Sequence, residues 1–379
     1  MRPEILLWKC TEKANAELET AFAGTVHRRI YGRIFLRPEI LLWKCTEKAN
    51  AELEWRLGRL KVIITDCDHD SIEIEKEIFA AAGMEMELKQ AISEEEVIEK
   101  CQEAEIFVVQ YAKITDKVME QCPKLKYVVR YGVGVDTVDV PAATRRGIQV
   151  GNVPDYGMNE VADHAIALAL AMTRKIVKMD AFTKNQVWDY TASIPIHRFC
   201  ELTVGVVGLG RIGRNFAKKM SALGFRVIGT DPYFQPSAET DSYVTLVSLD
   251  EVIGQSDIIS LHCPADGNQN LFNRETFRRM KNTAVLINVA RGGIINETDL
   301  YQALTEGELG GAALDCMAGE PVGRDCPLFR DENVIVTPHM AWYSEEAARE
   351  LKRKVAEEAV RFAKGEPIHY PINRPEQGR

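Results

Sequence analysis

The sequence predicts an α/β protein with two doubly wound parallel sheets, one in each of two domains. Two observations point to this class. Short apolar runs rich in β-branched residues alternate with helical segments along two successive stretches of the chain, as expected for parallel sheets covered by helices. The chain also has 379 residues, which is enough for two separate cores.

The first stretch begins at Leu60. Predicted strands cover residues 60–66, 84–88, 105–110 and 126–132, and predicted helices cover residues 74–82, residues 94–101 and a segment near Val118. The last strand leads into RYGVGVD, residues 130–136, where two glycines leave backbone amides facing a small anion and an arginine adds charge. A long apolar helix is then predicted over residues 158–177, as a crossover between the two domains.

The second stretch opens on a strand, helix and strand between Leu202 and Asp231 that contains GxGxxG. Gly208 permits the tight turn, Gly210 lets the backbone approach a pyrophosphate, and Gly213 permits close packing of helix on strand. Asp231 ends the second strand, where a carboxylate accepts hydrogen bonds from ribose hydroxyls and repels a 2′-phosphate. The unit therefore predicts NAD, rather than NADP, as the cofactor.

Polar side chains follow three of the remaining strands. The remaining strands are predicted at residues 243–247, 258–261, 284–289, 311–315 and 334–336. Helices are predicted at residues 249–253 and, capped by Ser344, through residue 364. Arg291, Asp315 and His339 lie at or just after strand ends, which is the edge where ligands bind in open α/β sheets. We therefore expect them to share one site.

These residues match the needs of 2-keto acid reduction. Arg291 can hold a carboxylate, and His339 can give or take a proton near neutral pH. Glu320, on the loop after Asp315, can hydrogen-bond the imidazole and stabilise the imidazolium. Taken singly, the three are better interpreted as a surface ion pair, a core histidine and a solvated loop acid. Their joint position beside a dinucleotide-binding unit favours catalysis.

Four motifs occur together in the chain: GLGRIG with Asp231, NVARGG, ALDCMAGEP and TPHMAWYSE. Over about residues 60–370 they resemble the D-isomer-specific 2-hydroxyacid dehydrogenases, and the last motif is most similar to the C-terminal binding protein branch. The resemblance implies an NAD-dependent enzyme that interconverts a D-2-hydroxy acid and its 2-keto acid. It also implies a homodimer, a central Rossmann NAD domain over residues 157–340, and a discontinuous flavodoxin-like substrate domain over residues 58–156 plus 341–379, with a cleft between the two domains.

The resemblance also assigns roles to particular residues. Arg291, Glu320 and His339 form the catalytic set, and Asp315 receives the nicotinamide carboxamide. Arg130, the backbone at Val133 and Gly134, Arg291 and Trp342 contact the substrate. The full set of predicted cofactor contacts is Gly208, Gly210, Arg211, Ile212, Gly213, Asp231, Cys263, Pro264, Val289, Asp315 and His339. No metal site is predicted, because Ser71 replaces the glycine that a calcium loop would need among the nearby aspartates.

Two alternatives remain open at this point. One is a 3-phosphoglycerate or hydroxypyruvate dehydrogenase specifically, with Arg130 and Lys113 as phosphate partners. The other is a dimeric, corepressor-like scaffold that senses NAD and binds short peptides.

Composition limits the partners. The formal charge of −9 argues against nucleic acid or an anionic membrane as a main partner, and no apolar run has the length of a membrane span. Nine cysteines without metal-site spacing fit reduced thiols in the cytoplasm. Residues 2–19 recur unchanged at 37–54, and we interpret residues 1–57 as a non-catalytic extension whose deletion leaves turnover intact.

Overall fold

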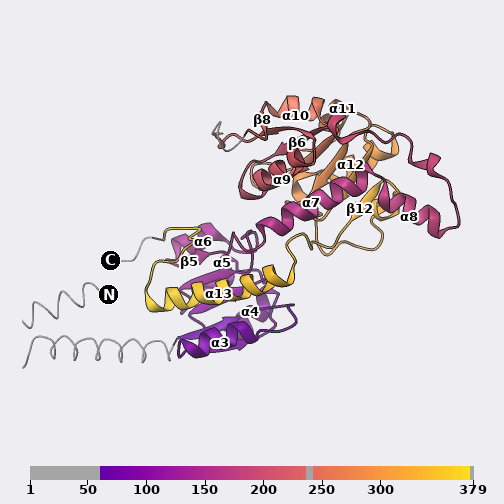
Figure 1. The fold of residues 1–379 in the computed structure, drawn as a ribbon. Coiled ribbons are helices and arrows are strands. Elements are labelled where there is room, and N and C mark those ends of the chain that lie inside the picture. Colours follow the sequence, from indigo (N-terminus) through magenta and orange to yellow (C-terminus); the bar gives the residue numbers. More distant parts are fainter. Residues whose placement is uncertain (1–59, 236–241, 376–379) are drawn as a thin grey trace, which may run out of the picture. The chain divides into compact units, whose positions relative to one another are not determined.

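The computed structural model describes residues 60–235 and 242–375 and contains two parallel sheets flanked by helices (Figure 1). The predicted fold class is therefore confirmed. The chain divides into two compact units: a discontinuous unit, residues 60–156 with 349–375, and a central unit, residues 157–348 without the gap. The predicted N-terminal extension lies outside the described residues.

The discontinuous unit contains a five-stranded parallel sheet in the order β2-β1-β3-β4-β5. Its strands are β1 (Lys61–Ile64), β2 (Glu85–Leu88), β3 (Ile106–Val109), β4 (Tyr127–Arg130) and β5 (Gln149–Gly151), and its helices include α3 (Glu73–Ala81), α4 (Glu94–Cys101), α5 (Asp116–Gln121) and α6 (Val140–Arg145). Every residue of β3 is buried, as expected for a central strand covered on both faces. The order reverses between β1 and β3, and the carboxyl ends of strands at such a switch point are where ligands bind in open α/β sheets.

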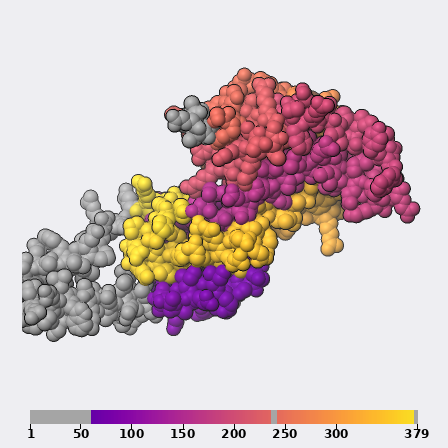
Figure 2. Space-filling view, in the orientation of Figure 1, coloured from indigo at the N-terminus to yellow at the C-terminus, as the bar shows by residue number. Residues whose placement is uncertain are grey.

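The end of the chain joins this unit through helix α13 (Glu345–Lys364) and the segment after it. Figure 2 shows α13, in yellow, forming one surface with α3, in indigo. Phe362 stacks on the buried Tyr127 with 4.5 Å between ring centroids, and the Asn373 carboxamide accepts a 2.7 Å hydrogen bond from the Val150 amide. These contacts join the two segments into one core.

The central unit contains a seven-stranded parallel sheet in the order β12-β11-β10-β9-β6-β7-β8. The strands are β6 (Thr203–Val207), β7 (Arg226–Thr230), β8 (Thr245–Leu246), β9 (Ile258–Leu261), β10 (Val285–Asn288), β11 (Gly311–Leu314) and β12 (Val334–Val336), and the helices are α7 (Met158–Thr173), α8 (Ile176–Lys184), α9 (Arg211–Ala222), α10 (Leu249–Gln255), α11 (Arg274–Arg279) and α12 (Glu297–Thr305). Short 3₁₀ turns add η1 (Tyr190–Ser193), η2 (Phe199–Glu201), η3 (Gly292–Ile294) and η4 (Pro327–Arg330). The strand order reverses between β6 and β9, so the GxGxxG turn after β6 lies at the switch point.

The helix predicted over residues 158–177 is wrong in its length. α7 ends at Thr173, and Lys175 takes a left-handed backbone conformation, with φ of 52°, before α8 begins. A left-handed residue cannot continue a right-handed helix. The short elements α6, β5 and α11 were not predicted, because segments of three to six residues carry too little periodicity to be recognised.

Among the helices in the described part of the chain, none combines the length and the apolar character that a membrane crossing requires.

Candidate active site

The glycine turn after β6 is shaped by backbone contact. Gly208 has φ of +93°, and a side chain there would collide with the backbone of His262 at the end of β9. A side chain at Gly213 would collide with the Gly208 carbonyl. Burial lowers the pKa of His262 to about 3, so the imidazole under this turn is uncharged at neutral pH. The sequence therefore needs both glycines to bring α9 against the ends of β6 and β9.

The start of α9 is suited to a phosphate. A Cβ at Gly210 would have no neighbour within 4 Å, and no side chain caps the helix at this residue. The first-turn amides of Arg211, Ile212 and Gly213 consequently lie at an uncapped helix N-terminus, where backbone N–H groups and the helix dipole favour an anion. The residues present fit the pyrophosphate of a dinucleotide.

Asp231 follows β7 and faces the same turn. Its two carboxylate oxygens accept hydrogen bonds from the amides of Leu209 (2.7 Å) and Tyr233 (2.8 Å). Because each carboxylate oxygen can accept more than one hydrogen bond, both retain capacity for the two ribose hydroxyls. Cys263 and Pro264 follow β9, and Val289 follows β10, so these predicted cofactor contacts share the carboxyl edge of the sheet.

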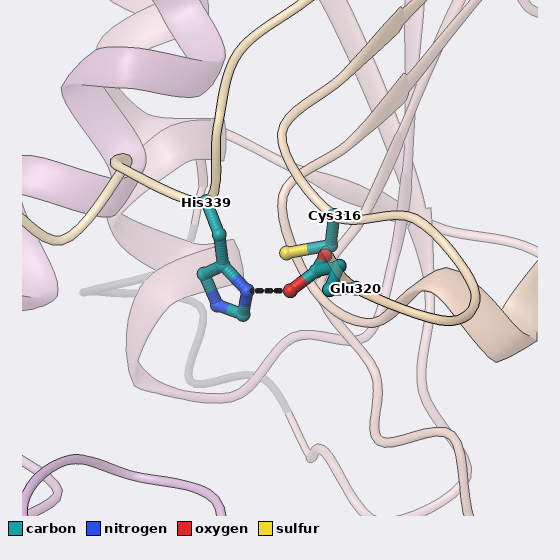
Figure 3. A group of neighbouring side chains, drawn as sticks. All are labelled: Cys316, Glu320 and His339. Atoms are coloured by element: carbon teal, nitrogen blue, oxygen red, sulfur yellow. Dashed lines mark hydrogen bonds and ion pairs between the residues drawn. The ribbon is translucent and has the colours of Figure 1, made fainter. Parts of the chain in front are cut away.

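His339 and Glu320 lie together at the carboxyl edge of β11 and β12. The imidazole Nδ1 of His339 lies 2.6 Å from Oε2 of Glu320 (Figure 3), and the two side chains are 44% and 34% exposed. His339 has φ of 51°, a left-handed conformation that costs a non-glycine residue of order 1–3 kcal/mol and is concentrated at functional sites. The surrounding fold therefore holds the His339 backbone in a conformation that histidine rarely adopts.

The charge state of Glu320 is fixed by its partners. Partial burial favours the neutral acid, but hydrogen bonds from His339 and from the Met317 amide outweigh burial and hold the pKa of Glu320 below its usual value. A carboxylate at neutral pH can stabilise a positive charge on the imidazole.

Arg291 is positioned by a short loop after β10. The buried Asn288 side chain donates a 2.9 Å hydrogen bond to the Arg291 carbonyl and accepts one from the Ala290 amide. A side chain at Gly292 would collide with the backbone at Met317, so this loop packs directly on the loop that carries Glu320. Arg291 is near enough to contribute to the lowered pKa of Glu320. Sequence reasoning missed Asn288, although it stands within the quoted NVARGG motif.

Asp315 is the anchor of the segment that carries His339. Its carboxylate is inaccessible to solvent and accepts hydrogen bonds from the Thr337 hydroxyl (2.6 Å) and from the amides of Met340 and Ala341 (both 2.9 Å). His164 of α7 completes the group, with Nε2 lying 3.0 Å from the Thr337 hydroxyl oxygen. Sequence reasoning gave His164 no role, because its partners stand more than 150 residues away in the chain.

This anchor yields a stability prediction. In Asp315→Asn, the carboxamide NH₂ would face a backbone N–H in place of an accepting oxygen, and charge-assisted hydrogen bonds would be lost. We expect the free energy of unfolding to fall by about 1.5–3 kcal/mol, measured by urea denaturation. Asp250→Asn, at an exposed ion pair with Arg279, is the matched control and is expected to leave it nearly unchanged, because exposed ion pairs contribute little to stability. Equal losses in both variants would contradict the anchor.

The predicted carboxylate-binding residues lie in the discontinuous unit, at the end of β4. Arg130 donates from Nε to the Gln110 carbonyl (3.3 Å), and its guanidinium lies over Gly132, where a side chain would collide with it. The Val133 carbonyl accepts a 2.6 Å hydrogen bond from Asn152, and Val133 itself is 43% exposed. Within this unit, the arginine and the glycine-rich backbone are thus next to each other.

Comparison with known proteins decides the family. The family described as "D-isomer specific 2-hydroxyacid dehydrogenase, NAD binding domain" matches residues 166–341. Over 283 residues the chain is 35% identical to a glyoxylate reductase of Korarchaeum cryptofilum, covering 72% of this chain and 84% of that relative. The chain belongs to the D-isomer-specific 2-hydroxyacid dehydrogenase family. NAD is therefore the cofactor of its matched domain, which lies within the central unit.

Other members of the family show similar agreement. The chain is 38% identical over 295 residues to a D-3-phosphoglycerate dehydrogenase of Archaeoglobus fulgidus, covering 77% of this chain and 56% of that relative. It thus spans little more than half the length of such relatives. The structure of D-lactate dehydrogenase from Aquifex aeolicus, complexed with NAD and lactic acid, superposes with a TM-score of 0.76 at 26% identity, covering 83% of this chain and 100% of that one.

A surface hollow of about 260 Å³ lies elsewhere on the central unit, lined by Leu202, Ile258 and Val285 among others. These residues stand at the amino ends of β6, β9 and β10. Because ligands of open α/β sheets bind at the carboxyl ends, we assign this hollow neither to the cofactor nor to the chemistry.

Proposed function

We propose that this D-2-hydroxyacid dehydrogenase family member is an NAD-dependent oxidoreductase that interconverts a D-2-hydroxy acid and its 2-keto acid. The observation that carries the proposal is the His339–Glu320 pair, held beside Arg291 at the carboxyl edge of the NAD-binding sheet. A base, its orienting acid and a fixed cation form the set that carbonyl reduction requires.

Each residue has a separate role in the reduction of the 2-keto acid. Bound NADH supplies the hydride that is transferred to the substrate C2. Arg291 holds the substrate carboxylate and polarises the carbonyl. His339, whose Nδ1 pairs with Glu320, donates a proton from Nε2 to the carbonyl oxygen, and Glu320 stabilises the imidazolium before that transfer. In the oxidation direction, His339 accepts the hydroxyl proton.

Further substrate contacts are proposed from the family resemblance. Arg130 with the backbone at Val133 and Gly134 would bind the substrate carboxylate, and the placement of a guanidinium over glycine backbone supports this. Trp342, whose backbone lies against Gly157 at the start of α7, would contact the substrate side chain. Similarity of the Trp342 segment to the C-terminal binding protein branch belongs to this proposal as well.

A second candidate is more specific. Relatives named D-3-phosphoglycerate dehydrogenase are 37–38% identical to this chain, which favours a phosphorylated three-carbon substrate. Arg130 and the exposed Lys113 are the cations we propose for its phosphate.

Substrate profiling tests both candidates. The full chain is assayed by the loss of NADH absorbance against glyoxylate, pyruvate, hydroxypyruvate, phosphohydroxypyruvate and phenylpyruvate. We expect turnover of at least one 2-keto acid, and the second candidate predicts the highest kcat/KM for phosphohydroxypyruvate. Tight NADH binding without turnover of any of them would contradict the enzymatic proposal and favour the NAD-sensing scaffold.

Cofactor preference tests the role of Asp231. In Asp231→Ala, the carboxylate that binds the ribose hydroxyls and repels a 2′-phosphate is absent, so the ratio of kcat/KM with NADH to that with NADPH is expected to fall by about 10–100-fold, for a loss of roughly 1.5–3 kcal/mol. Asp266→Asn, an exposed aspartate after β9, is the control. An unchanged ratio in Asp231→Ala would remove this residue from the ribose.

The lowered pKa of Glu320 makes its contribution to stability depend on pH. A carboxyl whose folded-state pKa lies below its unfolded value, about 4.3, stabilises the fold above that pH, and the contribution is lost as the pH falls through the folded-state value. The difference in Tm between the wild type and Glu320→Gln should therefore be largest at neutral pH and shrink below about pH 4.3. A difference that stays constant down to strongly acidic pH would contradict the pairing.

Two further proposals concern assembly and location. A homodimer is supported by large apolar side chains that are exposed after α8, where Trp188, Tyr190 and Ile194 are 91%, 75% and 61% accessible. A cytoplasmic location is supported by the described cysteines, all of which are unpaired. Sedimentation of the full chain tests the dimer.

A further inference from the structure

A third side chain reaches the His339–Glu320 pair. The Sγ of Cys316, at the end of β11, is turned toward the imidazole and the carboxylate (Figure 3). One nitrogen, one oxygen and one sulfur from these residues lie within 4.8 Å of one another. The set therefore contains an imidazole, a carboxylate and a thiol converging on one point.

This donor set has a chemical preference. Zn²⁺ takes tetrahedral sites made of cysteine sulfur, histidine nitrogen and carboxylate oxygen, whereas Mg²⁺ and Ca²⁺ prefer oxygen alone. Three protein ligands leave one tetrahedral position for water. Cys316 is buried, while Glu320 and His339 are partly exposed, so an ion can enter from the solvent side and meet the thiol beneath.

The surrounding charges are mixed. The buried Asp315 adjoins Cys316 in sequence, and Glu297 accepts a hydrogen bond from the Ala318 amide on the same loop. Burial, with the neighbouring Asp315 carboxylate, raises the pKa of the Cys316 thiol well above its usual value, so an ion must displace the thiol proton to bind there. Arg291 is close enough to affect both Cys316 and Glu320 electrostatically. Because a guanidinium opposes a cation, we expect reversible binding rather than a permanently held ion.

We infer that Cys316, Glu320 and His339 form a Zn²⁺ site, and that Zn²⁺ bound there inhibits the enzyme. An ion coordinated by Nδ1 and Oε2 would replace the 2.6 Å contact that orients the imidazole and would remove His339 from proton transfer. Binding stands on the three side chains alone, whereas inhibition rests on the proposed function.

Spectroscopy tests binding without any turnover. The full-length protein is titrated with Co²⁺, and a thiolate-to-Co²⁺ charge-transfer band that Zn²⁺ displaces is expected. Affinity for Zn²⁺, measured by competition with a chromophoric chelator, should fall by at least about 100-fold in Cys316→Ala, because loss of a second-shell partner alone costs about 10–100-fold. Cys326→Ala, the same substitution at a cysteine outside the cluster, should retain both the band and the affinity.

The outcomes separate the two claims. No band in the wild type, or the same band and affinity in Cys316→Ala, would overturn the site. His339→Ala is a second variant and should also weaken Zn²⁺ binding. Because His339 is exposed, this variant can be measured even if Cys316→Ala, at a buried position, does not fold. Loss of the band in both variants, together with no turnover of any 2-keto acid by metal-free wild type, would uphold the site and contradict the proposed function. Turnover that Zn²⁺ suppresses in the wild type at concentrations about 100-fold below those needed in Cys316→Ala would support both.

Discussion

His339→Ala is expected to lower kcat for 2-keto acid reduction by about 10²–10⁴-fold, the usual contribution of a positioned general acid. In the proposed mechanism the imidazole acts on the carbonyl oxygen and not on the dinucleotide phosphates, which we assign to the start of α9. The affinity for NADH, measured by quenching of protein fluorescence, should therefore remain within about threefold of the wild-type value.

The control is His197→Ala, because His197 is exposed and lines the hollow at the opposite edge of the central sheet. It should retain wild-type turnover. Near-normal kcat in His339→Ala would remove this residue from proton transfer. A large loss of NADH affinity in the same variant would instead give His339 a role in holding the cofactor.

Arg291→Lys is expected to reduce kcat/KM by about 10²-fold even though the positive charge is kept. A guanidinium can make two parallel hydrogen bonds to a carboxylate and a lysine ammonium cannot. Loss of one hydrogen bond to a charged group costs roughly 1.5–3 kcal/mol, and each 1.4 kcal/mol corresponds to a factor of ten. Steady-state kinetics should show both a higher KM and a lower kcat.

Arg330→Lys is the matched control, since Arg330 is exposed at the end of η4 in the same unit. Its kinetics should not change. If Arg291→Lys also behaves like the wild type, the arginine acts only as a point charge and the proposed bidentate contact is wrong.

Much of the fold was predictable because the buried strands have a recognisable apolar sequence. Val204, Val206 and Val207 are apolar on both sides of β6 and are all buried, and a strand buried on both faces has this composition. Breaks in helices were less predictable. The left-handed conformation of Lys175, which separates α7 from α8, has no counterpart in the local sequence, since lysine is an ordinary helix former.

The site residues that could be predicted from the sequence are those that come directly after strands. Arg291, Glu320 and His339 come after β10, β11 and β12, and parallel strands bring their carboxyl ends to one edge. Residues that act through contacts between distant segments were not predictable. His164 meets Thr337 only because α7 packs on this sheet, and Cys316 meets His339 only because two loops fold together.

The proposed activity is tested by NAD⁺ reduction with matched enantiomers of one 2-hydroxy acid, with lactate and glycerate as the first pairs and with the full chain freed of metal. We expect reduction with at least one D-enantiomer, none above background with its L-counterpart, and loss of the D-specific rate in His339→Ala. Equal rates with both enantiomers, or a D-specific rate that survives in His339→Ala, would contradict this expectation.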